Sequence, residues 1–171
     1  MPRYFALLRG VSPTNAKMPD LTRSFEAAGF ADVRTLLSSG NVAFSAGETP
    51  PAELERRAEA AMRAQLGRSF AAIVRPARHL QALVASDPFA EFDLPPSAKR
   101  VVTFLRRPPG VPVALPVERD GARILKLAGA EAFTAYEPGP KGPVFMLLLE
   151  RTFGTDVTTR TLATVARCAA A

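Results

Sequence analysis

Near the start of the chain, the hydrophobic positions change from a continuous run to a helical spacing. Residues 3–9 (RYFALLR) are aromatic and apolar, which predicts a buried strand. From Met18 to Gly29 the apolar positions recur with the period of a helix. Pro19 suits the first turn of that helix and Gly29 suits a left-handed end. The pattern therefore predicts a strand, a loop and a helix.

The stretch DVRTLLSSGNVAFSAG that follows is typical of a β-hairpin. We expect short strands at about 32–38 and 41–45, on either side of Ser39-Gly40. Another apolar run, SFAAIVR at residues 69–75, predicts a fourth strand.

A second helix is expected between the hairpin and the fourth strand. Thr49-Pro50 would supply its cap and first-turn proline, and Gly67 would end it. Its buried face carries Leu54, Ala58, Met62 and Leu66. The opposite face carries Glu53, Glu55, Arg57, Glu59 and Arg63. We expect this second face to be solvated, with glutamate and arginine paired four positions apart, as in Glu53/Arg57 and Glu59/Arg63.

These elements follow the order β-α-β-β-α-β, the split βαβ arrangement of a ferredoxin-like fold, and the predicted class is α+β. Residues 77–86 resemble a short helix, and 87–97 a loop or linker. We therefore divide the chain into a ferredoxin-like half at 1–76, a helix and linker at 77–98, and a C-terminal half at 99–171.

The second half partly echoes the first and is expected to be a related half ending in two helices. Strands are predicted at 99–107 and, as a hairpin, at 122–129 and 131–138. The run VFMLLL is apolar on all sides and by its pattern fits a strand as well as a helix. Lys141-Gly142-Pro143, just before this run, lacks the Walker pattern and is expected to form a turn.

The segment TTRTLATVARCAA at 158–170 has the spacing of an amphipathic helix. Thr158, Thr159 and Arg160 are expected to open that helix, with threonine as its N-cap. Arg160 could then pair with Glu150 or Asp156.

The composition is that of a globular protein. Hydrophobic residues make up 47% and charged residues 22% of the 171 residues, close to globular averages. The chain has no apolar stretch long enough for a membrane span, and its start lacks the pattern of a signal peptide. A single cysteine, Cys168, excludes an internal disulfide and fits a reducing compartment. We expect a cytosolic protein with no membrane association.

The net charge of +6 raises the question of a polyanionic partner. Only four of the 22 basic residues are lysines, and the arginines are scattered, with the densest groups at Arg56-Arg57 and Arg106-Arg107. A compositional bias explains this pattern as well as function does. Weak, sequence-independent binding of nucleic acid therefore stays open as an alternative.

Several stretches of this sequence resemble one bacterial family. The stretches are RGV, NAKMPDL and AGFADVRTLLSSGNVAF in the first half and ERTFGTDVTTR near the end. Together they resemble the family known as domain of unknown function 1697, over nearly the whole chain. The resemblance implies a ferredoxin-like first half, a related second half and a helix at VFMLLLERTF. Many members carry N-V-G-G after the R-G-V stretch, where this chain has Ser12-Pro13-Thr14-Asn15. The family brings no established reaction.

The topology predicts which loops meet at one edge. Neighbouring strands of a split βαβ sheet are antiparallel, so the loop after the first strand, the hairpin and the turn after the second helix share an edge. That edge should gather Arg9, Asn15, Lys17, Ser38, Ser39, Asn41 and Arg68. Cations beside amides, hydroxyls and a helix N-terminus can hold a phosphate or carboxylate. The alternative is that these residues only form turns and solvated surface.

Catalytic chemistry has few candidates. His79 is the only histidine and is expected on a helix surface, and Ser38 and Ser39 have no evident histidine partner. No cluster of metal-ligating residues and no cofactor motif is present, so we expect no cofactor. An enzyme whose site is assembled between the two halves remains an alternative.

The RNA-recognition motif has the same topology and displays aromatic residues on its first and third strands. The third strand here offers Phe44, and the first offers Tyr4 or Phe5, but the arginine and second aromatic of that motif are missing. We therefore favour a non-catalytic protein that binds a small anionic ligand or a protein partner at the predicted edge.

Overall fold

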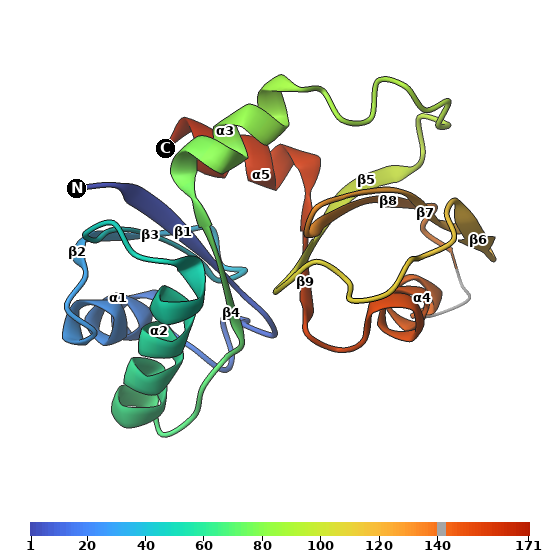
Figure 1. Ribbon diagram of the computed structural model, residues 1–171. Coiled ribbons are helices and arrows are strands. Elements are labelled where there is room, and N and C mark those ends of the chain that lie inside the picture. The colour runs from blue at the N-terminus through green and yellow to red at the C-terminus, as the bar shows by residue number, and fades with distance from the viewer. Residues whose placement is uncertain (140–142) are drawn as a thin grey trace. The chain divides into compact units, whose positions relative to one another are not determined.

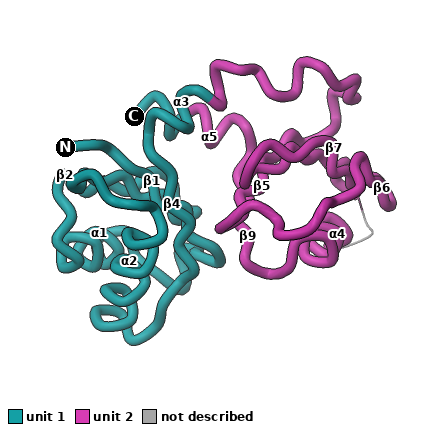
Figure 2. The backbone as a smooth tube through the Cα atoms, in the orientation of Figure 1, with its two compact units in different colours: residues 1–82, 167–171 teal, residues 83–166 magenta. Residues whose placement is uncertain are grey.

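The computed structural model describes residues 1–139 and 143–171. The chain divides into two compact units, one formed by residues 1–82 with 167–171 and the other by residues 83–166 (Figure 2). Both units combine an antiparallel sheet with helices, which confirms the α+β class. Among the described residues, no helix combines the length and the apolar character needed to cross a membrane.

The first unit has the predicted split βαβ order (Figure 1). Its elements are β1 (Arg3–Leu8), α1 (Met18–Ala27), β2 (Ala31–Leu36), β3 (Asn41–Ser45), α2 (Pro51–Leu66), β4 (Ala72–Pro76) and most of α3 (Ala77–Ala85). The sheet order is β2-β3-β1-β4, and every paired strand is antiparallel. Gly29 and Gly67, with φ of +91° and +73°, follow α1 and α2 as the left-handed ends expected from the sequence.

One face of this sheet packs on α1 and α2. The core there is aromatic, with Phe30 stacked on Phe44 at 4.3 Å and Tyr4 on Phe44 at 5.7 Å between ring centroids. Arg57 lies over the Phe30 ring at 4.7 Å and donates to the carbonyl of Ala28, just past the end of α1. Arg57 thus joins the two helices and does not pair with Glu53 as predicted.

The outer face of α2 differs from the prediction in two further ways. Glu55, expected in water, is buried and accepts the backbone N–H of Val74 at 2.9 Å. Glu59 accepts the N–H of Ala72 at 2.8 Å, whereas we expected it to pair with Arg63. The sequence pattern cannot reveal this because the partners are backbone groups of a strand. The cap of α2 is also shifted, with Pro50 at the N-cap and no side-chain cap from Thr49.

The second unit has a related order in which a loop replaces one helix (Figure 1). Its elements are β5 (Lys99–Leu105), β6 (Val117–Arg119), β7 (Ala122–Ala128), β8 (Glu131–Tyr136), α4 (Val144–Phe153), β9 (Val157–Thr161) and the start of α5 (Leu162–Ala170). The sheet order is β6-β7-β8-β5-β9. Apart from β6, this is the order of the first sheet, with β7, β8, β5 and β9 in the places of β2, β3, β1 and β4.

The ambiguous run VFMLLL lies in α4, as the family resemblance implied. Leu148 and Leu149 are buried while Leu147 is 55% exposed, so the helix has an outer face that the apolar pattern hides. Of the turn expected at Lys141-Gly142-Pro143, the first two residues lie outside the described residues.

The prediction for Thr158, Thr159 and Arg160 was wrong. They lie in β9, which pairs with β5, and not in the first turn of α5. Threonine is β-branched and well suited to a strand, and pairing with a distant strand decides the outcome here. The cap of α5 comes later, where the hydroxyl of Thr161 accepts the N–H of Thr164 at 3.3 Å. Asp156 pairs with Arg106 and not with Arg160.

Candidate functional site

Three segments of the first unit meet at one end of its sheet. The N–H of Leu8, the last residue of β1, donates to the carbonyl of Gly40 in the hairpin at 2.9 Å. The N–H of Arg9 donates to Ala71, just before β4, at 3.0 Å. These two bonds place the loop after β1 between the hairpin and the turn after α2, as the antiparallel topology requires.

Asn15 serves the loop itself. Its Nδ2 donates to the carbonyl of Gly10 at 2.7 Å, and its Oδ1 accepts the N–H of Ser12 at 2.8 Å. A third bond, between the hydroxyls of Ser12 and Thr14 at 2.8 Å, tightens the same turn. The Ser12-Pro13-Thr14-Asn15 stretch is therefore a self-braced turn with the Asn15 amide directed into it.

Asn41 has a similar role in the hairpin. It is fully buried, and its Nδ2 donates to the carbonyl of Leu36 at 2.9 Å and to the hydroxyl of Ser39 at 3.0 Å. Ser38 is exposed at the tip of the same turn. Asn15 and Asn41 thus hold the edge in shape, which is the turn-forming role left open by the sequence.

Basic side chains surround this edge. Lys17 is exposed immediately before α1, a helix whose N-terminus has no side-chain cap. Arg68 is exposed after α2, and its guanidinium lies 4.8 Å from the centroid of the Phe70 ring. Arg9 is half-buried at the end of β1.

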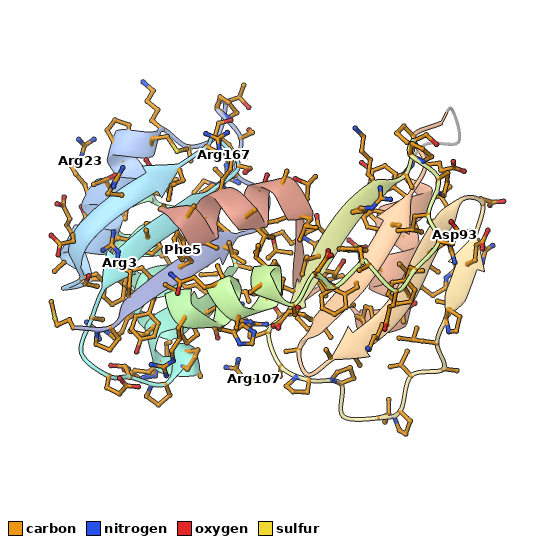
Figure 3. All side chains as sticks on the ribbon, turned by 90° about the horizontal axis from the view of Figure 1, so that it is seen from above. Arg3, Phe5, Arg23, Asp93, Arg107 and Arg167 are labelled. Atoms are coloured by element: carbon orange, nitrogen blue, oxygen red, sulfur yellow. The ribbon has the colours of Figure 1, made fainter. Side chains whose placement is uncertain are left out.

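A cavity of about 330 Å³ lies at the same end of the unit. It is lined by Asp20 and Arg23 on α1 and by Gln65 and Leu66 in the last turn of α2. Figure 3 shows Arg23 on the outer side of α1. Asp20 and Arg23 form an ion pair one turn apart, and α1 and α2 run in opposite directions, so the start of one helix meets the end of the other. The basic edge, as we call it from here on, consists of Arg9, Lys17, Arg23 and Arg68.

The sequence did not single out Arg23 or Gln65. The predicted topology could have indicated them. The antiparallel order of the elements that brings Arg68 to this edge also brings the last turn of α2 to the first turn of α1. Neither residue belongs to a motif, so only the packing of the two helices reveals their proximity.

The other cavities that concern us lie in the second unit. One of about 530 Å³ is lined by Asp120, Tyr136, Phe145 and neighbours, including Gly139 and Pro143. Those two residues flank the three positions that the structure does not describe, and we assign no role to this cavity. Another of about 320 Å³ lies beside Arg106 and Arg107.

His79 and Cys168, two residues considered for catalysis, both lie in the first unit. No group of three His, Cys, Asp or Glu side chains in that part of the chain could hold a metal ion. His79 is exposed on α3, and Cys168 is buried in α5. Tyr4, Phe5 and Phe44 are each at most 2% exposed, so none of the three can stack on a nucleic-acid base as in the RNA-recognition motif.

Comparison with known proteins adds a family and a fold. No curated protein matches the chain. A conserved bacterial protein from Streptococcus pneumoniae, SP0830, has a similar structure, with a TM-score of 0.71 and 18% sequence identity, over 99% of this chain and 97% of that one. Residues 1–133 match the model of the family described as Protein of unknown function (DUF1697). That match covers well over half of the chain, and the protein therefore belongs to this family, for which no specific function is indicated.

Proposed function

We propose that this protein is a non-catalytic binding protein that holds an anionic group at the basic edge. The observation that carries the proposal is the cavity between α1 and α2, which lies at the end of the unit where Lys17 and Arg68 are exposed. Arg23 lines that cavity, and its partner Asp20 is the one carboxylate among the four lining residues. Arg23 and Asp20 balance each other within the lining, so the positive charge that favours an anion comes from Lys17 and Arg68 at the same end of the unit.

Each polar residue of the edge then has one of two roles. Asn15, Ser39 and Asn41 hold the loop and the hairpin in place through their own hydrogen bonds. Lys17 and Arg68 provide charge, lysine as a mobile ammonium and arginine as a planar donor. An exposed site of this kind discriminates mainly by charge, so its affinity should fall as salt is added.

The cavity and the exposed cations beside it support binding, and an enzyme with a site between the two halves stays open as the alternative. We also propose the cytosol as its compartment, because the sole cysteine fits a reducing environment.

Thermal denaturation at low salt with inorganic phosphate, pyrophosphate and citrate tests the proposed function. At least one of these anions should raise the melting temperature. Lys17→Ala and Arg68→Ala should each lower the affinity for that anion by roughly threefold or more, because each removes one charge near the ligand. Arg56→Ala is the matched control, since Arg56 is exposed on α2 and pairs with Glu53. An equal loss in all three variants, or no response to any of the anions, would rule the site out.

A further inference from the structure

The hydrogen bonds of the two sheets define equivalent positions in the two units. In the first unit the N–H of Leu8 donates to Gly40 at 2.9 Å, and in the second the N–H of Leu105 donates to Ala130 at 2.8 Å. Each donor ends an inner strand of its sheet, the one next to the edge strand β4 or β9, and each acceptor lies in the hairpin before the neighbouring strand. Leu8 and Leu105 are therefore counterparts.

The next residue along also corresponds. The N–H of Arg9 donates to Ala71 at 3.0 Å, and the N–H of Arg106 donates to Asp156 at 3.4 Å. The loop that begins at Arg106 is thus the second unit's version of the loop that leads to α1. Both loops start with an arginine at the same place in the fold.

The two loops then diverge for a physical reason. The second loop reads RRPPGVPVALP, and its prolines cannot occupy the interior of a helix. No helix forms between β5 and β6, and all residues of this loop are described. In the first unit α1 packs beside α2, but α4 has no such neighbour in its own unit's described part. The proline-rich loop lies beside the last turn of α4 instead, and the two line an open cavity of about 320 Å³.

The lining of this cavity contains both charged and apolar side chains. Arg106 and Arg107 lie at the point where β5 ends, and Figure 3 shows Arg107 there. Arg106 is held by an ion pair from its Nε to Asp156 at 2.8 Å and is only 21% exposed. The apolar side chains of the lining include Val113 and also Phe153, which lies in the last turn of α4. The guanidinium of Arg107 donates to the backbone carbonyl of Arg106. The residues that line the cavity carry two guanidinium groups and one carboxylate, so the net charge of the lining is positive.

We propose that this cavity binds a small carboxylate that carries an apolar body. The carboxylate would lie against Arg106 and Arg107, since the fork of a guanidinium matches a carboxylate in geometry. The apolar body would contact Phe153 and lie toward the C-terminal end of α4, where the partial negative charge of the helix repels an anion. At about 30 Å³ for each water-sized group, the volume holds on the order of ten non-hydrogen atoms. This site goes beyond the proposed function and is independent of the basic edge.

Hydrocinnamate has a suitable size and provides a direct test by isothermal titration calorimetry, with its uncharged amide and inorganic phosphate as comparison probes. Hydrocinnamate should bind detectably, while the amide and phosphate should bind at least tenfold more weakly. Arg107→Ala should lower the affinity for hydrocinnamate by about tenfold. Val111→Asp should also lower this affinity. Val111 lines the cavity and is 71% exposed, so an aspartate there would add a repelling charge without disturbing the core.

Controls separate this site from the basic edge. Arg119→Ala, an exposed arginine on β6 that lines none of the cavities described above, should leave hydrocinnamate binding unchanged, and so should Lys17→Ala and Arg68→Ala. Absence of hydrocinnamate binding overturns the proposal, as does equal binding of the amide or of phosphate. Full retention of affinity in Val111→Asp overturns it even if Arg107→Ala does not fold.

Discussion

At the scale of single residues, Gly40 decides how closely the loop after β1 and the hairpin between β2 and β3 approach each other. Its φ is +83°, a left-handed conformation that favours glycine. A Cβ placed there would lie 2.9 Å from the Cβ of Val11 and 3.0 Å from that of Leu8. Both neighbours are Cβ atoms fixed to the backbone, so neither can move aside without the chain.

We therefore expect Gly40→Ala to lower the free energy of unfolding by about 2 kcal/mol or more, from backbone strain and overpacking together. Gly67→Ala is the matched control, because Gly67 has a similar φ of +73° and a Cβ added there would meet nothing within 4 Å. Gly67→Ala should lower the free energy of unfolding by only about 1 kcal/mol, the cost of the left-handed conformation. Urea denaturation of both variants measures the difference, and equal losses would contradict the steric argument.

Single residues also show how much of the candidate site the sequence could predict. It located the loop and hairpin at one edge, because strand order and direction follow from the pattern of elements. It could not decide what Asn15 and Asn41 do, since asparagine is common both in turns and in ligand sites. Only the bonds from Asn15 to Gly10 and from Asn41 to Leu36 distinguish these roles.

At the scale of elements, β4 is an edge strand of the first sheet, and its outward N–H groups are covered by α2. Glu55 and Glu59 are one helical turn apart, and they accept the N–H groups of Val74 and Ala72, which are two residues apart in the strand. A strand edge with unpaired N–H groups is prone to pair with another chain. The two carboxylates occupy those groups and thereby shield the edge.

Glu55→Ala should accordingly lower the free energy of unfolding by about 2–3 kcal/mol, because it leaves the buried N–H of Val74 without this acceptor. Glu55→Gln keeps an acceptor oxygen, so it should lower the free energy of unfolding by less. Glu53→Ala, which removes only an ion pair with Arg56 at the helix surface, should be close to neutral. Urea denaturation ranks the three variants, and a neutral Glu55→Ala would refute the role of this carboxylate.

The local pattern does not determine α4 or β9. The apolar run of α4 fits a strand as well as a helix because its core-facing and outward residues are both apolar, and only the family resemblance implies the helix. The threonines of β9 suit helix caps as well as strands. Long-range contacts decide both elements, packing in the case of α4 and pairing with β5 in the case of β9, and a local pattern does not contain them. The short strand β6 lies within proline-broken sequence and was not predicted either.

At the scale of the whole molecule, the two units repeat one plan down to a buried arginine. Arg75 in β4 and Arg160 in β9 are each 7% exposed, and each donates from Nη1 to the carbonyl of the residue before it. Their cross-strand partners are Phe5 and Val102, which the alignment of Leu8 with Leu105 also makes equivalent. The sequence shows only a faint echo between the halves because the side chains differ while the backbone pairing is kept.

The net charge of +6 is also a property of the whole molecule, and it leads to a prediction about nucleic acid. Tyr4, Phe5 and Phe44 are buried, so the first sheet offers none of these rings for base stacking, and we expect charge to dominate the attraction of an oligonucleotide. Fluorescence anisotropy with a generic single-stranded oligonucleotide should therefore show weak binding at low salt that disappears at physiological salt. Heparin, a polyanion without bases, is the control and should compete on the basis of charge alone. Tight binding that persists at physiological salt, or a preference for one base sequence, would contradict this expectation and favour the nucleic-acid alternative.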